Sequence, residues 1–137
     1  MALLDDVETR LSTQSVGGIA GSTSVTDTGW LITKTYMPPD PDKVITIYET
    51  GGSPPEPRAE VDYPTFQVRV RSGTTGYSTG MEKLAAVQMA LHGLTATHNS
   101  WYYPGFWAQG DALSLGFDQE TRPILAQNFR AARSRTS

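Results

Sequence analysis

The chain has 137 residues, a mass of 14.9 kDa and a net charge of −3 at neutral pH, so residues 1–137 are expected to form a single domain. The absence of cysteine excludes a disulfide framework, a thiolate nucleophile and a cysteine-ligated zinc site, and the acidic balance argues against a nucleic-acid-binding protein. No apolar run approaches the roughly 20 residues of a membrane helix, and the N-terminus lacks the basic region of a signal peptide. We therefore expect a soluble protein.

Charge is distributed unevenly along the chain. Residues 1–68 carry a net charge of −6 and residues 69–137 a net charge of +3. Halves of opposite sign suit head-to-tail self-association, in which one face of a subunit meets a different face of the next. A solvated surface that happens to be lopsided is the alternative interpretation.

The first half of the chain predicts one helix and two strands. A helix is expected at residues 3–14, because the apolar residues there recur at helical spacing. They are Leu3, Leu4, Val7 and Leu11. Strands are expected at residues 30–37 and 43–49, which are rich in aromatic and β-branched side chains, and the prolines from Pro38 onward end the first of them.

Residues 51–64 predict a long proline-rich loop. Prolines stiffen the backbone and block strand pairing, and this segment contains Pro54, Pro55, Pro57 and Pro64. Loops of this length inside a compact domain are usually functional or disordered. We expect an arm that reaches a neighbouring subunit or another partner.

Residues 65–71 give the clearest strand pattern of the chain. Apolar and polar residues alternate strictly, so Phe66, Val68 and Val70 are expected to face the core. Gln67, Arg69 and Arg71 are then expected on the opposite face, in water or against a partner.

A second helix is expected at residues 78–94. Thr79 and Glu82 have the spacing of a capping box at its start. Its expected apolar stripe consists of Met81, Leu84, Val87, Leu91 and Leu94.

The last third of the chain predicts two more strands, at residues 113–117 and 124–133, joined by a turn at residues 118–121. Before them, residues 101–107 hold five aromatic side chains. These could stack on sugars or bases, or they could be core or interface anchors. Residues 134–137 are expected to be frayed.

The order of these elements is helix, three strands, helix, two strands. Consecutive short strands around a helix are typical of the α+β class. We expect a small mixed, largely antiparallel sheet of about five strands with two helices packed on it.

One segment matches the motif of a serine-hydrolase nucleophile. Gly76-Tyr77-Ser78-Thr79-Gly80 reads G-x-S-x-G between a predicted strand and a predicted helix. However, both histidines precede Asp111 and Asp118, whereas the acid should come before the histidine. Glycine and hydroxyl residues are also common at the start of a helix, and this explains the segment better. A small serine hydrolase using Ser78 is therefore a minor alternative.

Other candidate sites are weaker. His92 and His98 lack the spacing of a zinc site. Asp40-Pro41-Asp42 lacks three positions of a calcium loop, and its prolines prevent the loop geometry. Residues 17–21 lack the lysine of a phosphate-binding loop. No metal or cofactor is implied. Arg130, Arg133 and Arg135 form a basic cluster for which protein contact or solvation is the better interpretation.

Three segments carry a resemblance to a known family. The first is residues 64–71, a strand ending in alternating Val and Arg. The second is the predicted second helix, opened by Tyr77. This helix contains Ala85, Ala86 and Leu91, and it ends at Leu94. The third runs from Asp118 through Arg122-Pro123-Ile124 to Gln127-Asn128-Phe129-Arg130. In this order they resemble the minor capsid proteins, or tail terminators, of long-tailed (siphovirus-like) phages.

The resemblance implies a structural protein of the virion without catalysis. Such proteins form a ring, usually of six subunits, that caps the tail tube at the head-tail junction and meets the head-side connector or stopper protein. The genome passes through the ring without sequence-specific recognition. Thr121 stands where the family often has glycine, and residues 101–107 match no family feature. The alternative of an adjacent head-tail joining protein therefore stays open.

We expect the contacts with subunits and partners to involve the arginine face, the proline-rich segment and the aromatic segment. The candidate residues are Arg69, Arg71, Pro54, Pro55, Glu56, Arg58, Trp101, Tyr103, Arg122 and Arg130.

Overall fold

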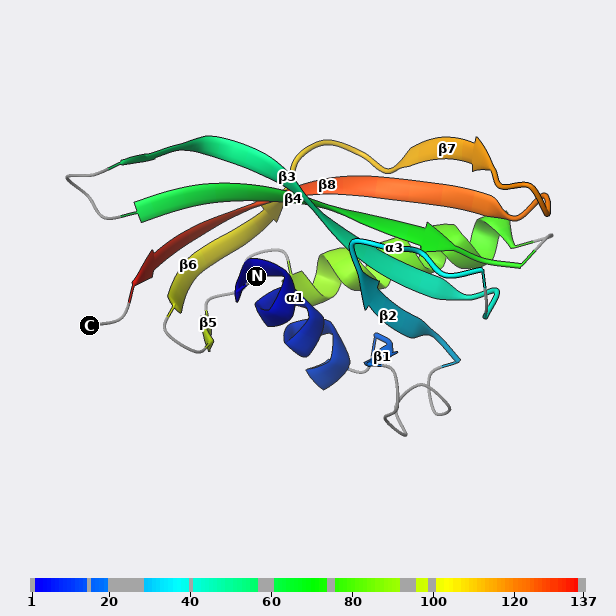
Figure 1. The fold of residues 1–137 in the computed structure, drawn as a ribbon, viewed down its shortest axis with the longest axis horizontal. Coiled ribbons are helices and arrows are strands. Elements are labelled where there is room, and N and C mark those ends of the chain that lie inside the picture. The colour runs from blue at the N-terminus through cyan, green and yellow to red at the C-terminus, as the bar shows by residue number, and fades with distance from the viewer. Residues whose placement is uncertain are drawn as a thin grey trace.

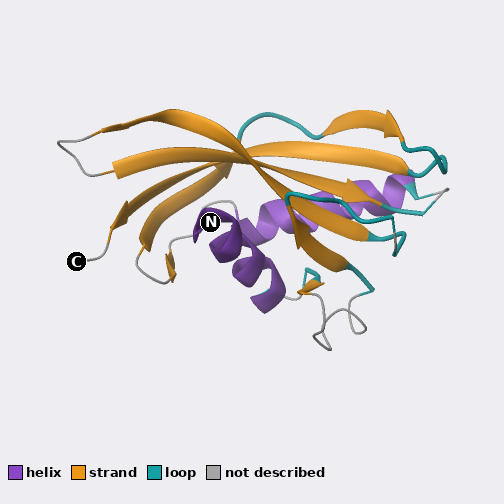
Figure 2. Cartoon of the chain, in the orientation of Figure 1, coloured by secondary structure: helices purple, strands orange, loops and turns teal. Residues whose placement is uncertain are grey.

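An open sheet of long strands forms one layer of the molecule, and both helices cover the same side of it (Figures 1 and 2). The computed structural model describes residues 2–14, 16–19, 29–39, 41–56, 61–73, 76–91, 96–98 and 101–135. In chain order the elements are α1 (Ala2–Thr13), β1 (Gly18–Ile19), β2 (Leu31–Lys34), β3 (Val44–Glu56), β4 (Val61–Arg71), α3 (Tyr77–Leu91), β5 (Ala96–His98), β6 (Trp101–Ala108), β7 (Leu113–Phe117) and β8 (Pro123–Arg135).

The described residues form eight strands in the order β1-β2-β3-β4-β8-β6-β5, with β7 beside β8. The β1–β2 and β2–β3 pairs are parallel, and the other pairs are antiparallel. The α+β class with a mixed, largely antiparallel sheet and two helices is therefore confirmed. The additional strands are β6 and two short pieces, β1 and β5, of two and three residues.

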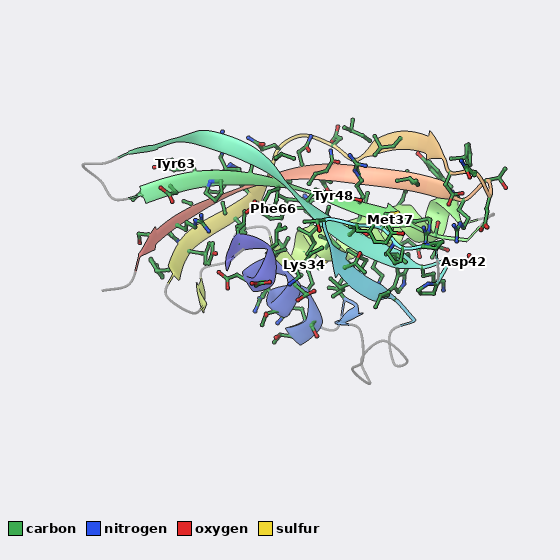
Figure 3. All side chains as sticks on the ribbon, in the orientation of Figure 1. Lys34, Met37, Asp42, Tyr48, Tyr63 and Phe66 are labelled. Carbon is green, nitrogen blue, oxygen red and sulfur yellow. The ribbon has the colours of Figure 1, made fainter. Side chains whose placement is uncertain are left out.

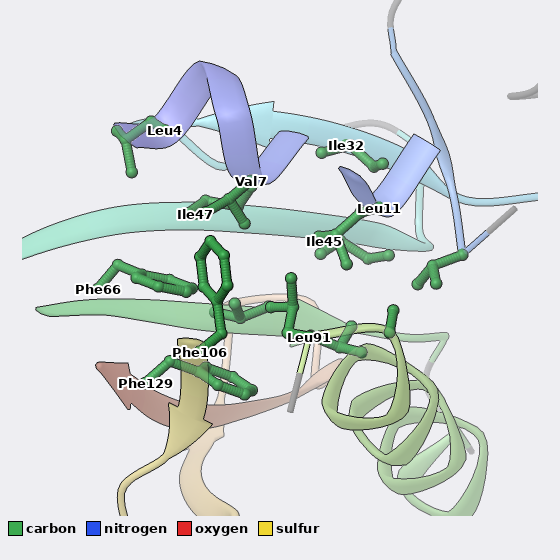
Figure 4. Packing of buried hydrophobic residues seen from close by; sticks show 14 of the residues in the cluster. Leu4, Val7, Leu11, Ile32, Ile45, Ile47, Phe66, Leu91, Phe106 and Phe129 are labelled. Atoms are coloured by element: carbon green, nitrogen blue, oxygen red, sulfur yellow. The ribbon is translucent and has the colours of Figure 1, made fainter. Parts of the chain in front are cut away.

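The hydrophobic core lies between the helices and the sheet (Figure 4). Leu4, Val7 and Leu11 of α1 pack there, as the helical spacing predicted. Phe66 stacks on Phe129 with ring centroids 5.4 Å apart. Burial of these side chains is the main stabilising contribution to the fold, since each fully buried large apolar side chain is worth about 1.5–3 kcal/mol.

The prediction of a loop at residues 51–64 was wrong. β3 continues to Glu56 and β4 begins at Val61, so most of the segment is an antiparallel hairpin, with Gly52 paired to Pro64. Pairing is possible because β2 covers β3 only as far as Ile47, which leaves the rest of β3 at an edge where proline needs no hydrogen-bond partner. The register of the β3–β4 pair shifts between Ser53 and Glu56, the stretch of β3 that contains Pro54 and Pro55. The hairpin extends beyond the helices, at the opposite end of the longest dimension from β7 (Figure 1).

The prediction of a strand at residues 30–37 was too long at its end. β2 stops at Lys34, and Thr35 has a φ of 64°, a left-handed conformation that a strand does not allow. Lys34 lies beside α1 (Figure 3), where it forms an ion pair with Asp5 and a second one with Glu8 at 3.5 Å. This contact fixes the edge of the sheet to the first helix.

The second helix begins earlier than its capping-box pattern indicated. α3 starts at Tyr77, so Thr79 lies within its first turn and is not the cap. The Gly80 N–H donates to the Gly76 carbonyl at 2.8 Å, and the Ser72 hydroxyl donates to the same carbonyl at 2.5 Å. A Cβ at position 80 would lie 2.8 Å from Leu125 Cδ1, which is why glycine stands where α3 crosses β8. The expectations for His92, Gly93 and Leu94 fall outside the described residues.

The predicted strand at residues 113–117 is confirmed as β7, and that at 124–133 is confirmed within the longer β8. The turn at residues 118–121 is also confirmed, since the Thr121 N–H donates to the Asp118 carbonyl at 3.0 Å. The aromatic segment is strand β6, which pairs with the second half of β8. No helix in the described part of the chain is long and apolar enough to cross a membrane.

Candidate subunit and partner interface

The side of the sheet that carries no helix presents a polar, ordered surface centred on Arg69. The alternation along β4 buries Phe66, Val68 and Val70 on the helix side and turns Gln67 and Arg69 to the opposite side. This confirms the predicted orientation of that strand. We call the surface formed by Tyr48, Gln67, Arg69 and Asn128 the Arg69 face.

Two neighbouring side chains hold the Arg69 guanidinium in place, and a third holds one of them. Its Nε donates to Gln67 Oε1 at 2.6 Å, and Gln67 Nε2 in turn donates to Asn128 Oδ1 at 3.0 Å. The Tyr48 ring lies 4.6 Å from Arg69 Cζ, within cation–π distance. None of the ion pairs among the described residues gives Arg69 a carboxylate partner. The result is a fixed, half-buried cation whose charge is not neutralised within that part of the chain.

Arg71 behaves differently from Arg69, although the strand pattern grouped them. Only 3% of Arg71 is exposed. Its Nη2 donates to the Pro41 carbonyl at 2.6 Å and its Nε to the Asp42 carbonyl at 3.2 Å. The expectation that Arg71 faces water or a partner was therefore wrong, because its guanidinium satisfies the backbone of the connection that leads into β3.

Arg122 is also buried, with 4% of its surface exposed, and it joins two segments. Its Nε donates to Asp118 Oδ2 at 2.8 Å, and its Nη1 donates to the Pro39 carbonyl at 2.8 Å and to Asp42 Oδ1 at 3.0 Å. Burial opposes ionisation of Asp118, but hydrogen bonds from the Arg122 N–H and guanidinium and from the Glu120 N–H outweigh it and lower the pKa of Asp118 below its ordinary value. In the isolated chain Arg122 is thus a clamp between the β7–β8 turn and the β2–β3 connection.

Tyr103 belongs to the core, which settles the alternatives left for this part of the aromatic segment. It is fully buried, its ring stacks on Phe106 with centroids 4.9 Å apart, and its hydroxyl donates to the buried Asp6 carboxylate. Burial and this hydrogen bond raise the pKa of the Tyr103 hydroxyl well above its ordinary value. An exposed contact through Tyr103 is therefore excluded for the folded chain.

The remaining candidates are placed only in part. Arg130 is half-buried in β8, paired in register with Thr65 on one side and Trp107 on the other. Pro54, Pro55 and Glu56 lie in the outer half of β3, and Trp101 begins β6, but their side chains lie outside the described residues. Arg58 lies outside the described residues altogether.

The sequence patterns missed a second surface, on α3. Tyr77, Met81, Ala85 and Met89 recur every four residues and are exposed, Met89 by 86%. The expectation that Met81 belongs to the buried stripe was wrong, because Gly80 occupies the contact with β8. The sequence did contain a signal for this surface. With only Glu82 and Lys83 charged, the helix has too few charged residues for an ordinary solvated face.

Two exposed carboxylates border this stripe. Glu82 follows Met81 on the helix, and Asp111 lies across an open hollow of about 310 Å³ that Met81 and Ala85 also line. Neither carboxylate forms an ion pair among the described residues. We call the stripe with these two acids the α3 surface.

The structure does not assemble a hydrolase site around Ser78 in the described part of the chain. Ser78 is exposed in the first turn of α3, and it is not among the described residues with positive φ, as a strained nucleophile elbow would require. The imidazoles of His92 and His98 lie outside the described residues. In the described ranges no group of three or more His, Cys, Asp or Glu residues could hold a metal ion.

Comparisons with known proteins agree with the fold and extend it. A chain from a solved structure described as "Virion of native gene transfer agent (GTA) particle" is similar to this one, with a TM-score of 0.71 and 19% sequence identity over 96% of this chain and 94% of that chain. At that identity the likeness shows a shared fold. Comparison with curated proteins gives no match.

A family model described as "Bacteriophage tail terminator protein" matches residues 4–135, almost the entire chain. The resemblance found in the strand at residues 64–71, the second helix and the C-terminal strand is thereby confirmed. The chain belongs to the bacteriophage tail terminator family, and it is a structural protein of the phage tail and the virion.

Proposed function

We propose that this protein ends the tail tube as a ring, with six copies as the expected number, and presents a surface to the head-side connector. The observation that carries the proposal is the family match over residues 4–135. The resemblance in three ordered segments supports the same role. In this role the protein acts by shape, and no step of covalent chemistry is required of it.

Features of the described residues are compatible with such a ring. A closed ring needs heterologous contacts, in which two different surfaces of one subunit meet on neighbouring copies. The Arg69 face and the α3 surface lie on opposite sides of the sheet and differ in charge and composition. A ring of this kind would let the genome pass through its opening without sequence-specific recognition.

We further propose that the β3–β4 hairpin is an arm that contacts a neighbouring subunit or the tail tube. It extends from the sheet away from both helices (Figure 1). The proposed contacts are made by Pro54, Pro55, Glu56 and Arg58. Exchanging the charges in the variant Glu56→Arg, Arg58→Glu should weaken binding to the tube protein or to other copies while leaving the thermal unfolding midpoint unchanged.

The test is assembly of the full-length protein with and without its tail tube protein. Negative-stain images should show rings at the ends of tubes, and tubes should stop lengthening when the protein is added. Binding to the connector alone, with no effect on the tube, would instead identify an adjacent head-tail joining protein. Ester hydrolysis that disappears in Ser78→Ala would contradict the structural role altogether.

A further inference from the structure

The Arg69 face has the chemistry of a site that receives a carboxylate from another protein. The guanidinium is held by Gln67 and Tyr48, so little side-chain freedom remains to be lost on binding. Its outer nitrogens form a planar fork that matches a carboxylate. In the same row across the sheet, Arg69 pairs with Ala126 and Ala126 with Leu113, an exposed apolar side chain on the same face. Arginine, tyrosine and exposed leucine together favour a protein partner.

A nucleic-acid partner is a poorer match to this face. Binding to phosphates requires several cations that together displace counterions. The face carries Arg69 with Arg130 at its border, while Arg71 is buried and bonded to backbone carbonyls. The chain as a whole has a net charge of −3.

The α3 surface is complementary to the Arg69 face, because it combines exposed negative charge with exposed apolar area. Glu82 and Asp111 are exposed without cations to pair with among the described residues. Lys83, the nearest cation in sequence to Glu82, donates to the Val16 carbonyl at 2.8 Å and lies over the Trp30 ring at 5.2 Å, so it is directed toward its own chain. Tyr77, Met81 and Met89 provide exposed apolar surface beside these acids.

We propose that the α3 surface of one copy docks on the Arg69 face of the next copy, with the carboxylates of Glu82 and Asp111 supplying the negative charge opposite Arg69. The two surfaces lie on opposite sides of the sheet, since both helices cover one side (Figure 2). One copy therefore cannot satisfy its own pair, and each contact leaves one surface of each kind free for another copy. This inference rests on the proposed ring and names the contact that would build it.

A charge exchange between full-length variants tests the contact. Arg69→Glu, and separately the double variant Glu82→Lys, Asp111→Lys, should each place like charges in every contact and weaken self-association by about tenfold or more. When the two variants are mixed in equal amounts, opposite charges meet again in every contact of an alternating ring of six. Native mass spectrometry should then recover the wild-type ring size. Glu49→Lys is the matched control, because Glu49 is exposed and belongs to neither surface.

Folding is checked by the thermal unfolding midpoint, and Arg69→Gln replaces Arg69→Glu if the reversal unfolds the chain. Each measurement is made with and without the tail tube protein. If both charge-reversed variants form wild-type rings, the proposed contact is overturned while the ring itself stands. The same holds if the variants form rings that no longer bind the tube. A mixture that stays dissociated would also overturn it. A wild-type protein that stays monomeric even with the tube would instead remove the proposed function on which the inference rests.

Discussion

Arg122 Nη1 donates to the Pro39 carbonyl at 2.8 Å, which ties the start of β8 to a connection that lies 83 residues earlier in the chain. The same nitrogen bonds Asp42, and Arg71 donates to the Pro41 and Asp42 carbonyls from the neighbouring strand. Two buried arginines therefore fix the backbone between β2 and β3, where prolines and a left-handed Thr35 prevent regular pairing. Arg71 and Arg122, which both belong to the segments that resemble the family, thus form these hydrogen bonds within their own chain.

Arg122→Ala should destabilise the fold by about 1.5–3 kcal/mol, because it removes the buried guanidinium that donates to Asp118 Oδ2 and to the Pro39 carbonyl. Equilibrium unfolding in urea measures the change. Arg122→Lys is the control: it keeps the charge but cannot reproduce the planar fork, so its loss should fall between zero and that of alanine. Equal stability of the alanine variant and the wild type would contradict the clamp.

Acid should remove part of this clamp. The pKa of Asp118 is lower in the folded chain than in the unfolded chain, so its contribution to stability is fully present above the unfolded value of about 4 and is lost as the pH falls through the folded pKa. Asp118→Asn should therefore be less stable than the wild type at neutral pH, and the difference should shrink below about pH 4. Thermal midpoints measured across this range test it, and a difference that stays constant with pH would argue against the ion pair.

Tyr103→Phe should cost about 1–3 kcal/mol of stability, because the buried Asp6 carboxylate loses a hydrogen-bond donor while no apolar volume is lost. Tyr102→Phe on the same strand is the matched control, since Tyr102 is 39% exposed. Its effect should stay within about 0.5 kcal/mol. Denaturant unfolding of both variants under the same conditions distinguishes them, and equal losses would show that the Tyr103 hydroxyl contributes nothing particular.

Phe66→Ala should be among the most damaging core substitutions, at about 3–5 kcal/mol. The Phe66 ring is fully buried between Phe129, at 5.4 Å, and Phe106, at 6.3 Å, so its removal opens a cavity at the centre of the sheet. Met89→Ala deletes a side chain that is 86% exposed and should change the unfolding free energy by less than about 0.5 kcal/mol. A comparable loss in both variants would mean that Met89 packs against the core in solution.

The sequence predicted what depends on local pattern. The apolar spacing of Leu4, Val7 and Leu11 identified α1, and the alternation from Phe66 to Arg71 identified both the strand and its buried side. These patterns are strong because each element has one face in the hydrophobic core, so its apolar residues must recur at the period of a helix or a strand.

Features that depend on distant neighbours escaped prediction. Pro54 and Pro55 can lie in a paired strand because the outer half of β3 is an edge, which the local sequence does not reveal. Arg69 and Arg71 have the same pattern position, yet Arg71 is buried because Pro41 and Asp42 cover it. Likewise, the exposure of Met81 follows from the close approach of Gly80 to Leu125.

Electron microscopy of the purified full-length protein mixed with its tail tube protein is the decisive test of the proposed ring. Closed rings are expected, each seated at the end of a tube whose length no longer increases. A protein that stays monomeric beside tubes that continue to grow, and that never occupies their ends, would contradict it.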